Sequence, residues 1–138
     1  MRIAELIRPG ETVLPEQAPL AAAVALFRQY TVKYVYLVDA ANRYRGVVAL
    51  HDIAPRFQDP ALASQACSSV ARPDAIPLLT AGMGLDETLR EFMRHHGERL
   101  PIVRAQDDPE LLGTVHKTDL LDAYVRLNRA LLHPRIEA

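Results

Sequence analysis

Apolar residues follow two similar patterns along this 138-residue chain, about 65 residues apart. Each pattern opens with three apolar residues spaced i, i+4 and i+7, which places them on one stripe of a helix. These residues are Leu20, Val24 and Phe27 in the first copy and Leu85, Leu89 and Phe92 in the second. Such an internal repeat decides the architecture, because each copy is then one structural unit.

Each predicted helix is followed by two short apolar runs that are typical of strands. The first run covers residues 35–38 and 100–103, and the second begins with Gly46-Val47-Val48 and Gly113-Thr114-Val115. In both copies an aspartate, Asp52 or Asp119, follows the glycine by six residues. The spacing of the copies differs by two residues in the turn between the runs, where insertions are tolerated.

The repeat predicts an α+β fold in which two β-α-β-β-α units are related by a pseudo-two-fold axis, with small three-stranded sheets packed between helices. One unit has too few elements to bury its apolar faces, so we expect the two to pack sheet to sheet. We expect strands over 12–14, 34–39, 44–50, 76–79, 100–104 and 111–116, and helices over 19–30, from 52, and over 62–71, 85–96 and 118–132. The predicted organisation is a first motif over 1–58, a linker with a short helix over 59–75, a second motif over 76–127, and a helix end and tail over 128–138.

The composition is that of one ordinary globular domain, with 49% hydrophobic and 24% charged residues. A formal net charge of −1 gives no electrostatic reason to expect nucleic acid or an anionic membrane as a partner. The sequence shows no secretory leader and no run of about 20 apolar residues, so we expect a cytoplasmic protein without direct membrane insertion. Cys67 is the single cysteine, which excludes a disulfide within the chain and is typical of a reducing compartment.

Residues with reactive side chains are present, but they form no catalytic pattern. His95 and His96 are adjacent, so on a helix they point about 100° apart and rarely share a metal ion. Ser68 and Ser69 lack the G-x-S-x-G context of a nucleophilic serine, and the neighbours of Cys67 supply no base or positive charge. The sequence therefore predicts a protein that is not an enzyme, holds no metal and requires no cofactor.

The segment from the glycine to the aspartate resembles the closing segment of the CBS (cystathionine-β-synthase) motif, Gly–apolar–apolar–(Ser/Thr)–x–x–Asp. It reads Gly46-Val47-Val48-Ala49-Leu50-His51-Asp52 in the first copy and Gly113-Thr114-Val115-His116-Lys117-Thr118-Asp119 in the second. The resemblance covers almost the whole chain, from about Ile3 to Leu127, and implies two CBS motifs that form one regulatory module. The phrases GVVALHDI, GERLPIV and LLGTVHKTDLL are most similar to the cytoplasmic C-terminal CBS pairs of bacterial ClC-type chloride channels and antiporters.

The resemblance also implies a ligand site, because adenosine nucleotides often bind between the two motifs of this family. The closing aspartate accepts hydrogen bonds from the ribose hydroxyls, a pairing that suits a carboxylate and a cis-diol. Both aspartates are present here, whereas Ala49 and His116 occupy the Ser/Thr positions. We therefore expect the better site at Asp119, where His116 and Lys117 favour phosphate and apolar residues contact the adenine. The predicted ligand-binding residues are Asp119, His116, Lys117, Thr118, Leu78, Leu79 and Pro101, with Asp52 in the poorer site.

The residues leave alternatives open at two points. Both aspartates lie at the starts of predicted helices and could act only as N-terminal caps. The module could dimerise, bind AMP, ADP or ATP as a regulatory ligand, and tune an attached or associated ClC-type transport domain. It could instead be a ligand-free homodimerisation module, or the regulatory domain of a metabolic enzyme or kinase.

Overall fold

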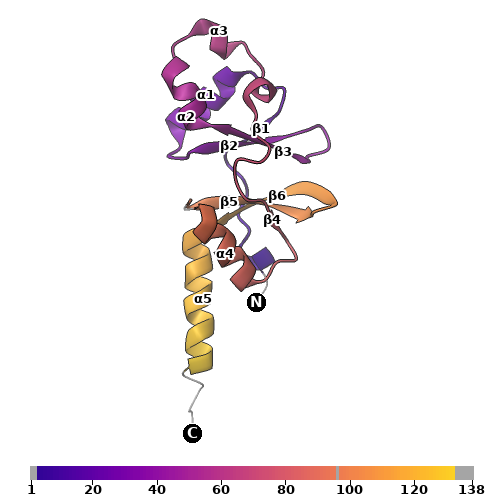
Figure 1. Cartoon of the computed structure of the whole chain (residues 1–138), viewed down its shortest axis with the longest axis vertical. Coiled ribbons are helices and arrows are strands. Elements are labelled where there is room, and N and C mark those ends of the chain that lie inside the picture. Colours follow the sequence, from indigo (N-terminus) through magenta and orange to yellow (C-terminus); the bar gives the residue numbers. More distant parts are fainter. Residues whose placement is uncertain (1–2, 96, 133–138) are drawn as a thin grey trace.

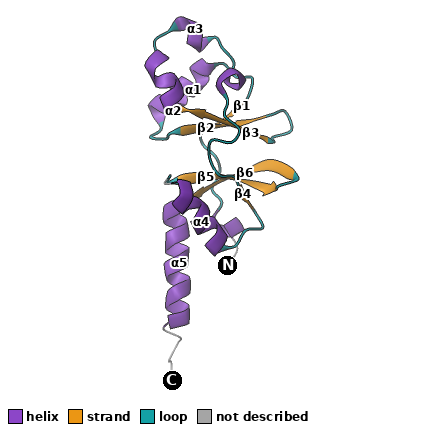
Figure 2. Ribbon diagram, in the orientation of Figure 1, coloured by secondary structure: helices purple, strands orange, loops and turns teal. Residues whose placement is uncertain are grey.

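The computed structural model describes residues 3–95 and 97–132 as two stacked halves (Figure 1). The sheets of the two halves face one another, with helices on the outer sides (Figure 2). The first half contains β1 (Val13–Pro15), α1 (Leu20–Gln29), β2 (Tyr34–Val38), β3 (Tyr44–Ala49) and α2 (Leu50–Ile53). The second half contains β4 (Leu79–Thr80), α4 (Leu85–His95), β5 (Arg99–Ala105), β6 (Asp108–His116) and α5 (Lys117–Leu132). The connecting region holds α3 (Pro60–Ala63), and 3-10 turns cover Ile3–Leu6, Ala54–Arg56 and Cys67–Val70.

The two sheets have the same topology. In each, the first strand runs parallel to the second, and the second pairs antiparallel with the third, giving the orders β1-β2-β3 and β4-β5-β6. The antiparallel register shifts at the same place in both, beside the pairs Leu37–Gly46 and Ile102–Gly113. The fold class and the three-stranded sheets predicted from the repeat are confirmed.

Alternate residues of β2 enter two different cores, because successive side chains of a strand point to opposite faces of the sheet. Val35 and Leu37 pack beside Leu20 of α1, in the core of the first half. Tyr36 and Val38 face the other way and join the core that contains the buried residues of the second half. Both faces of this sheet are therefore covered, as sheet-to-sheet packing requires.

The connecting region differs from the single helix predicted over 62–71. The chain forms the one-turn helix α3 and, after an extended stretch, a 3-10 turn. The extended stretch pairs with the start of α1: the Gln65 carbonyl accepts a hydrogen bond from the Leu20 N–H, and the Cys67 N–H donates to the Ala18 carbonyl. Backbone groups used in this way cannot also form the hydrogen bonds of a continuous helix.

Several element boundaries also differ from the prediction; strand β6, for example, begins at Asp108 rather than at 111. Strand β4 covers only Leu79–Thr80 rather than 76–79, and Pro77 explains the shortening because it has no N–H to donate to a neighbouring strand. Helix α2 begins at Leu50, two residues before Asp52. His96 and the predicted tail over 133–138 lie outside the described residues.

The segment that leads into each half crosses over and pairs with the last strand of the other half. Arg8, which precedes β1, exchanges two backbone hydrogen bonds of 2.8 and 2.9 Å with Thr114 of β6. Arg72, which precedes β4, exchanges two of 2.9 and 3.1 Å with Val47 of β3. Ile3 belongs to the same leading segment as Arg8, and its side chain is fully buried in the core that contains the buried residues of the second half. The halves are therefore tied by backbone pairing as well as by side-chain packing.

The glycine of each repeat makes these crossings possible. Gly46 and Gly113 have φ angles of +116° and +147°, which residues with a side chain rarely adopt. A Cβ atom at Gly46 would lie 2.8 Å from the carbonyl oxygen of Arg72, and one at Gly113 would overlap the carbonyl oxygen of Arg8. The close approach of the crossing segment thus explains why glycine occupies both positions.

Replacing Gly113 by alanine should disrupt the crossing at Arg8. We expect Gly113→Ala to lower the free energy of unfolding by roughly 2–4 kcal/mol, because the added methyl group overlaps the backbone and the φ angle becomes strained. Urea unfolding followed by circular dichroism measures this change. Gly82→Ala is the matched control, since no atom lies within 4 Å of a Cβ placed there. Equal stability of the two variants would contradict the close crossing.

Candidate functional site

Asp52 and Asp119 occupy equivalent places in the two halves, as the third residues of α2 and α5. Each carboxylate accepts two hydrogen bonds from one arginine. Arg72 donates from Nε and Nη2 to the Asp52 oxygens at 2.5 and 2.8 Å. Arg8 donates from the same atoms to the Asp119 oxygens at 2.6 and 2.7 Å. The structure therefore contains the same bidentate ion pair twice.

The interpretation of the aspartates as helix caps is wrong. The residue before α2 is Ala49, which makes no side-chain cap, and Asp52 lies inside the helix. Asp119 likewise lies within the first turn of α5, and its carboxylate binds the side chain of Arg8. Each aspartate instead holds a segment that arrives from the other half.

Arg8 and Arg72 are absent from the site residues that the sequence predicts, although the sequence contains a signal for them. Their separation is close to the spacing of the repeat, and each precedes the first strand of its own copy. Spacing alone cannot show that each arginine reaches an aspartate of the other half, because that contact depends on the crossing of the segments. The partner arginines become visible only in the folded chain.

Each arginine lowers the pKa of its aspartate, chiefly through the side-chain hydrogen bonds. Both carboxylates are therefore ionised at neutral pH, and each ion pair has no net charge. About half of each arginine side chain is exposed, so water screens the pairs and they contribute little to stability.

The predicted residues just before Asp119 lie at the junction of β6 and α5. His116 ends β6 and is half-buried, and its pKa is lowered, first by burial and then by the positive charge of Arg99. Its imidazole is therefore mostly neutral at pH 7 and offers a hydrogen bond rather than a positive charge. Lys117 begins α5 and is half-buried, and Thr118 is exposed.

Of the predicted adenine contacts, Pro101 pairs in the sheet with Thr114, two residues before His116, whereas Leu78 and Leu79 lie just before and in β4. Leu79 and Pro101 are buried in the second half. Leu78 is half-buried and lines two cavities of about 690 and 490 Å³. Asp119 lines a different cavity of about 230 Å³ together with Arg8. The roles of the three apolar residues in ligand binding stay predictions.

Other candidate chemistry is limited in the part of the chain that the structure describes. There, no group of three or more His, Cys, Asp or Glu residues could hold a metal ion, and no helix is long and apolar enough to cross a bilayer. Cys67 is fully buried, and burial raises the pKa of its thiol to about 11. The thiol is therefore protonated at neutral pH and is a poor nucleophile.

The family model of the CBS domain matches the chain twice, over residues 3–59 and 68–126. The chain belongs to the CBS domain family. The two matches coincide with the two halves of the fold, so the molecule is a pair of CBS domains, and it is a regulatory module. No curated protein matches the chain.

Solved structures of other CBS pairs have the same fold. A CBS domain pair/ACT domain protein from Thermotoga maritima is 24% identical, with a TM-score of 0.74 over 92% of this chain and 98% of that one. The CBS domains of a transcriptional regulator from Streptococcus pneumoniae are 18% identical, with a TM-score of 0.72 over 88% and 98%. The CBS pair of a proposed Mg²⁺ transporter from Shewanella oneidensis is 24% identical, with a TM-score of 0.76 over 92% and 71%. At these identities the likeness shows the fold alone.

The narrower resemblance to ClC-type proteins is not shown by these comparisons. Their structural matches come from proteins with different names, including a transcriptional regulator and a proposed Mg²⁺ transporter. The CBS fold is thus established, whereas these comparisons show neither the ligand nor the effector of this pair.

Proposed function

We propose that this CBS pair is a regulatory sensor that binds an adenosine nucleotide at Asp119, and that the nucleotide replaces the Arg8–Asp119 ion pair. The ion pair itself supports the proposal. A carboxylate that can accept hydrogen bonds from a ribose cis-diol lies beside a guanidinium that can bind phosphate. One nucleotide therefore offers partners to both groups.

Nucleotide binding requires the Arg8 side chain to move. The cavity of about 230 Å³ beside Asp119 is smaller than the roughly 300–1,000 Å³ typical of small-molecule sites. Half of the Arg8 side chain is exposed, so it can swing outward to enlarge the cavity and meet the phosphate. Lys117, two residues before Asp119, can add a second positive charge to the phosphate site. The equivalent site at Asp52 is poorer, because Ala49 offers no side-chain hydrogen bond.

The position of Arg8 suggests how the ligand regulates. Its backbone pairs with β6 in the second half, while the chain continues from it into β1 of the first half. A nucleotide that moves its side chain acts where the two halves are tied. Binding would then favour one relative arrangement of the halves, and an effector that senses this arrangement would respond.

The effector that we propose is a membrane ion-transport domain of the ClC type, attached to or associated with this CBS pair at the cytoplasmic face. The phrases shared with ClC-type CBS pairs support this choice, and CBS pairs of similar fold occur in a magnesium transporter and a proposed Mg²⁺ transporter. A metabolic enzyme or a kinase is the alternative effector. In each case the CBS pair binds and signals, and the chemistry belongs to its effector.

Nucleotide binding should raise the melting temperature of the domain. AMP, ADP or ATP at about 100 times its dissociation constant should add about 2.7 kcal/mol to the free energy of unfolding. Asp119→Asn should strongly reduce the shift, because the amide replaces one of the two acceptor oxygens by an NH2 donor and removes the negative charge. Differential scanning fluorimetry measures the shift, and Asp52→Asn, which removes the equivalent ion pair, is the matched control that should keep it. No shift with any of the three nucleotides, or an undiminished shift in Asp119→Asn, would contradict the proposal.

A second candidate function is homodimeric assembly, and it is favoured by an apolar surface on the outer helices. Met93 of α4 and Leu121 and Val125 of α5 are 63%, 42% and 48% exposed. Helices α4 and α5 contact each other, and the C-terminal part of α5 extends away from the sheets (Figure 1). A second copy of the chain could cover these side chains, whether or not a nucleotide binds.

Dimerisation through this surface should be sensitive to a buried charge. We expect the wild-type chain to elute as a dimer and Val125→Glu to elute as a monomer, because an unpaired carboxylate is costly at an apolar interface. Size-exclusion chromatography with light scattering measures the mass. Gln29→Glu adds a carboxylate to the exposed end of α1 in the other half and should leave the dimer intact. A monomeric wild-type chain, or a dimeric Val125→Glu, would argue against this surface.

A further inference from the structure

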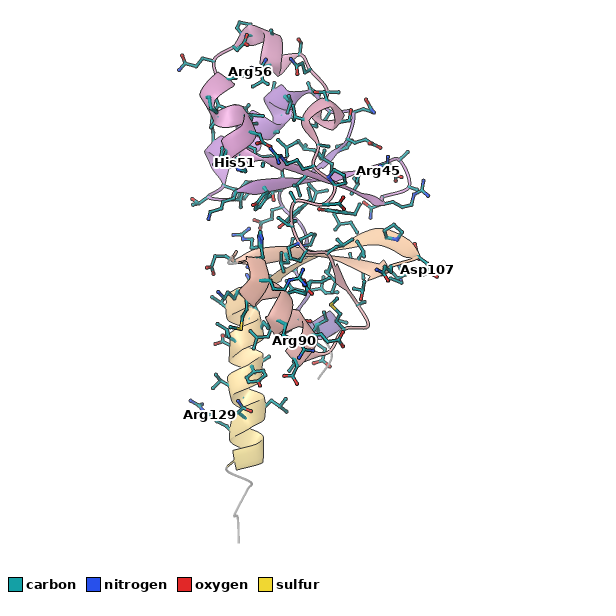
Figure 3. All side chains as sticks on the ribbon, viewed as in Figure 1. Arg45, His51, Arg56, Arg90, Asp107 and Arg129 are labelled. Atoms are coloured by element: carbon teal, nitrogen blue, oxygen red, sulfur yellow. The ribbon has the colours of Figure 1, made fainter. Side chains whose placement is uncertain are left out.

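A groove of about 690 Å³ lies between the start of β3 and the segment that leads into β4. Its lining includes Tyr44 and Arg45 of β3, Ile76 and Leu78 of the leading segment, and Glu16 just after β1. Figure 3 shows Arg45 and His51 on opposite sides of the first half. Since His51 adjoins Asp52, the groove is distinct from the edge that carries the aspartate.

An exposed pair of opposite charges stands at this groove. Arg45 Nε lies 3.5 Å from Glu16 Oε1, and 54% of the Arg45 side chain is exposed. The Glu16 backbone is fixed, because its N–H donates to Val38 and its carbonyl accepts from Ser68. The position of Glu16 beside the groove is therefore fixed by its backbone, while the exposed Arg45 guanidinium is loosely held and can turn toward a ligand.

The lining also contains apolar side chains and a second carboxylate. Ile76 is 6% exposed, Leu78 is half-buried, and the ring of Tyr44 packs against the same core. Asp74 is exposed and adds a second carboxylate to the lining, so the charged groups carry one excess negative charge. Tyr44 lines the groove, and its buried hydroxyl has no hydrogen-bond partner among the described residues.

We propose that this groove binds a free α-amino acid with an apolar side chain, its ammonium group on Glu16 and its carboxylate on Arg45. An α-amino acid carries its two opposite charges on groups bonded to the same carbon, which matches a carboxylate and a guanidinium that lie side by side. Its side chain would lie against Ile76 and Leu78, where apolar surface leaves water. The excess negative charge disfavours ligands with extra anionic groups, such as glutamate or a nucleotide.

This site gives the CBS pair a second input that is independent of the nucleotide proposed for Asp119. Glu16 follows β1 in the first half, whereas Ile76 and Leu78 belong to the segment that enters the second half. A ligand that touches both would affect the relation of the two halves from the edge opposite Asp52. The two inputs could then act on the same arrangement of the halves.

Isothermal titration of the full chain with L-leucine tests the proposal. We expect saturable binding that weakens roughly tenfold or more in Glu16→Gln and in Arg45→Gln. N-acetyl-leucine, which lacks the ammonium group, and leucinamide, which lacks the carboxylate, should each bind more weakly than leucine. Arg43→Gln is the matched control, because Arg43 lies on the same hairpin and pairs with Asp39 at 2.9 Å, outside the lining of the groove; this variant should bind leucine normally.

No saturable binding of leucine up to about 10 mM, or unchanged binding in Arg45→Gln, would overturn the proposal. Equal affinity for leucine and its two derivatives would also overturn it, since the charges would then not be recognised. The outcome is separable from that of the nucleotide site. Asp119→Asn should still bind leucine, and Arg45→Gln should keep any thermal shift caused by a nucleotide.

Discussion

The backbone pairing of each leading segment with the last strand of the other half is the constraint on which this structure depends. Arg8 pairs with Thr114 and Arg72 with Val47. The last strand of each half is therefore extended by a segment that leads, in sequence, into the other half. This arrangement requires a residue without a side chain at Gly46 and Gly113. Two small sheets that would each be marginal alone thereby become one interlocked unit.

The same crossing creates the candidate site. Because the backbones of Arg8 and Arg72 are held beside the last strands, their side chains reach the aspartates that follow those strands, Asp119 and Asp52. The closing aspartate of each CBS motif is therefore already bound by an arginine of the same chain. The nucleotide that we propose at Asp119 would compete with a contact between the halves, and this competition would couple binding to a change in their arrangement.

Most of the fold could be predicted from the sequence, because the signals that define it are local and occur twice. The helical spacing of Leu20, Val24 and Phe27, repeated about 65 residues later, and the apolar runs that follow are sufficient for α1, α4 and the paired strands. The connecting region was harder, since the hydrogen bonds of Gln65 and Cys67 with the start of α1 override the local preference for helix.

The site could be predicted only in part. The aspartates are visible as the end of a repeated segment, and the structure places both in equivalent positions. Their arginine partners depend on contacts between residues far apart in the sequence, for example Arg8 and Asp119. The groove at Arg45 is formed by three separate stretches of chain, and no local sequence pattern predicts that they lie together.

Native-state hydrogen exchange measured by NMR tests the interlocked arrangement most directly. The amides of Arg8, Thr114, Val47 and Arg72 donate the four hydrogen bonds of the two crossings. If the crossings hold the halves together, these amides should exchange only through global unfolding, with the same free energy of opening as the central strands β2 and β5. Fast exchange of Arg8 and Arg72 while the amides of β2 and β5 stay protected would contradict the account, because the leading segments would then open without separating the halves.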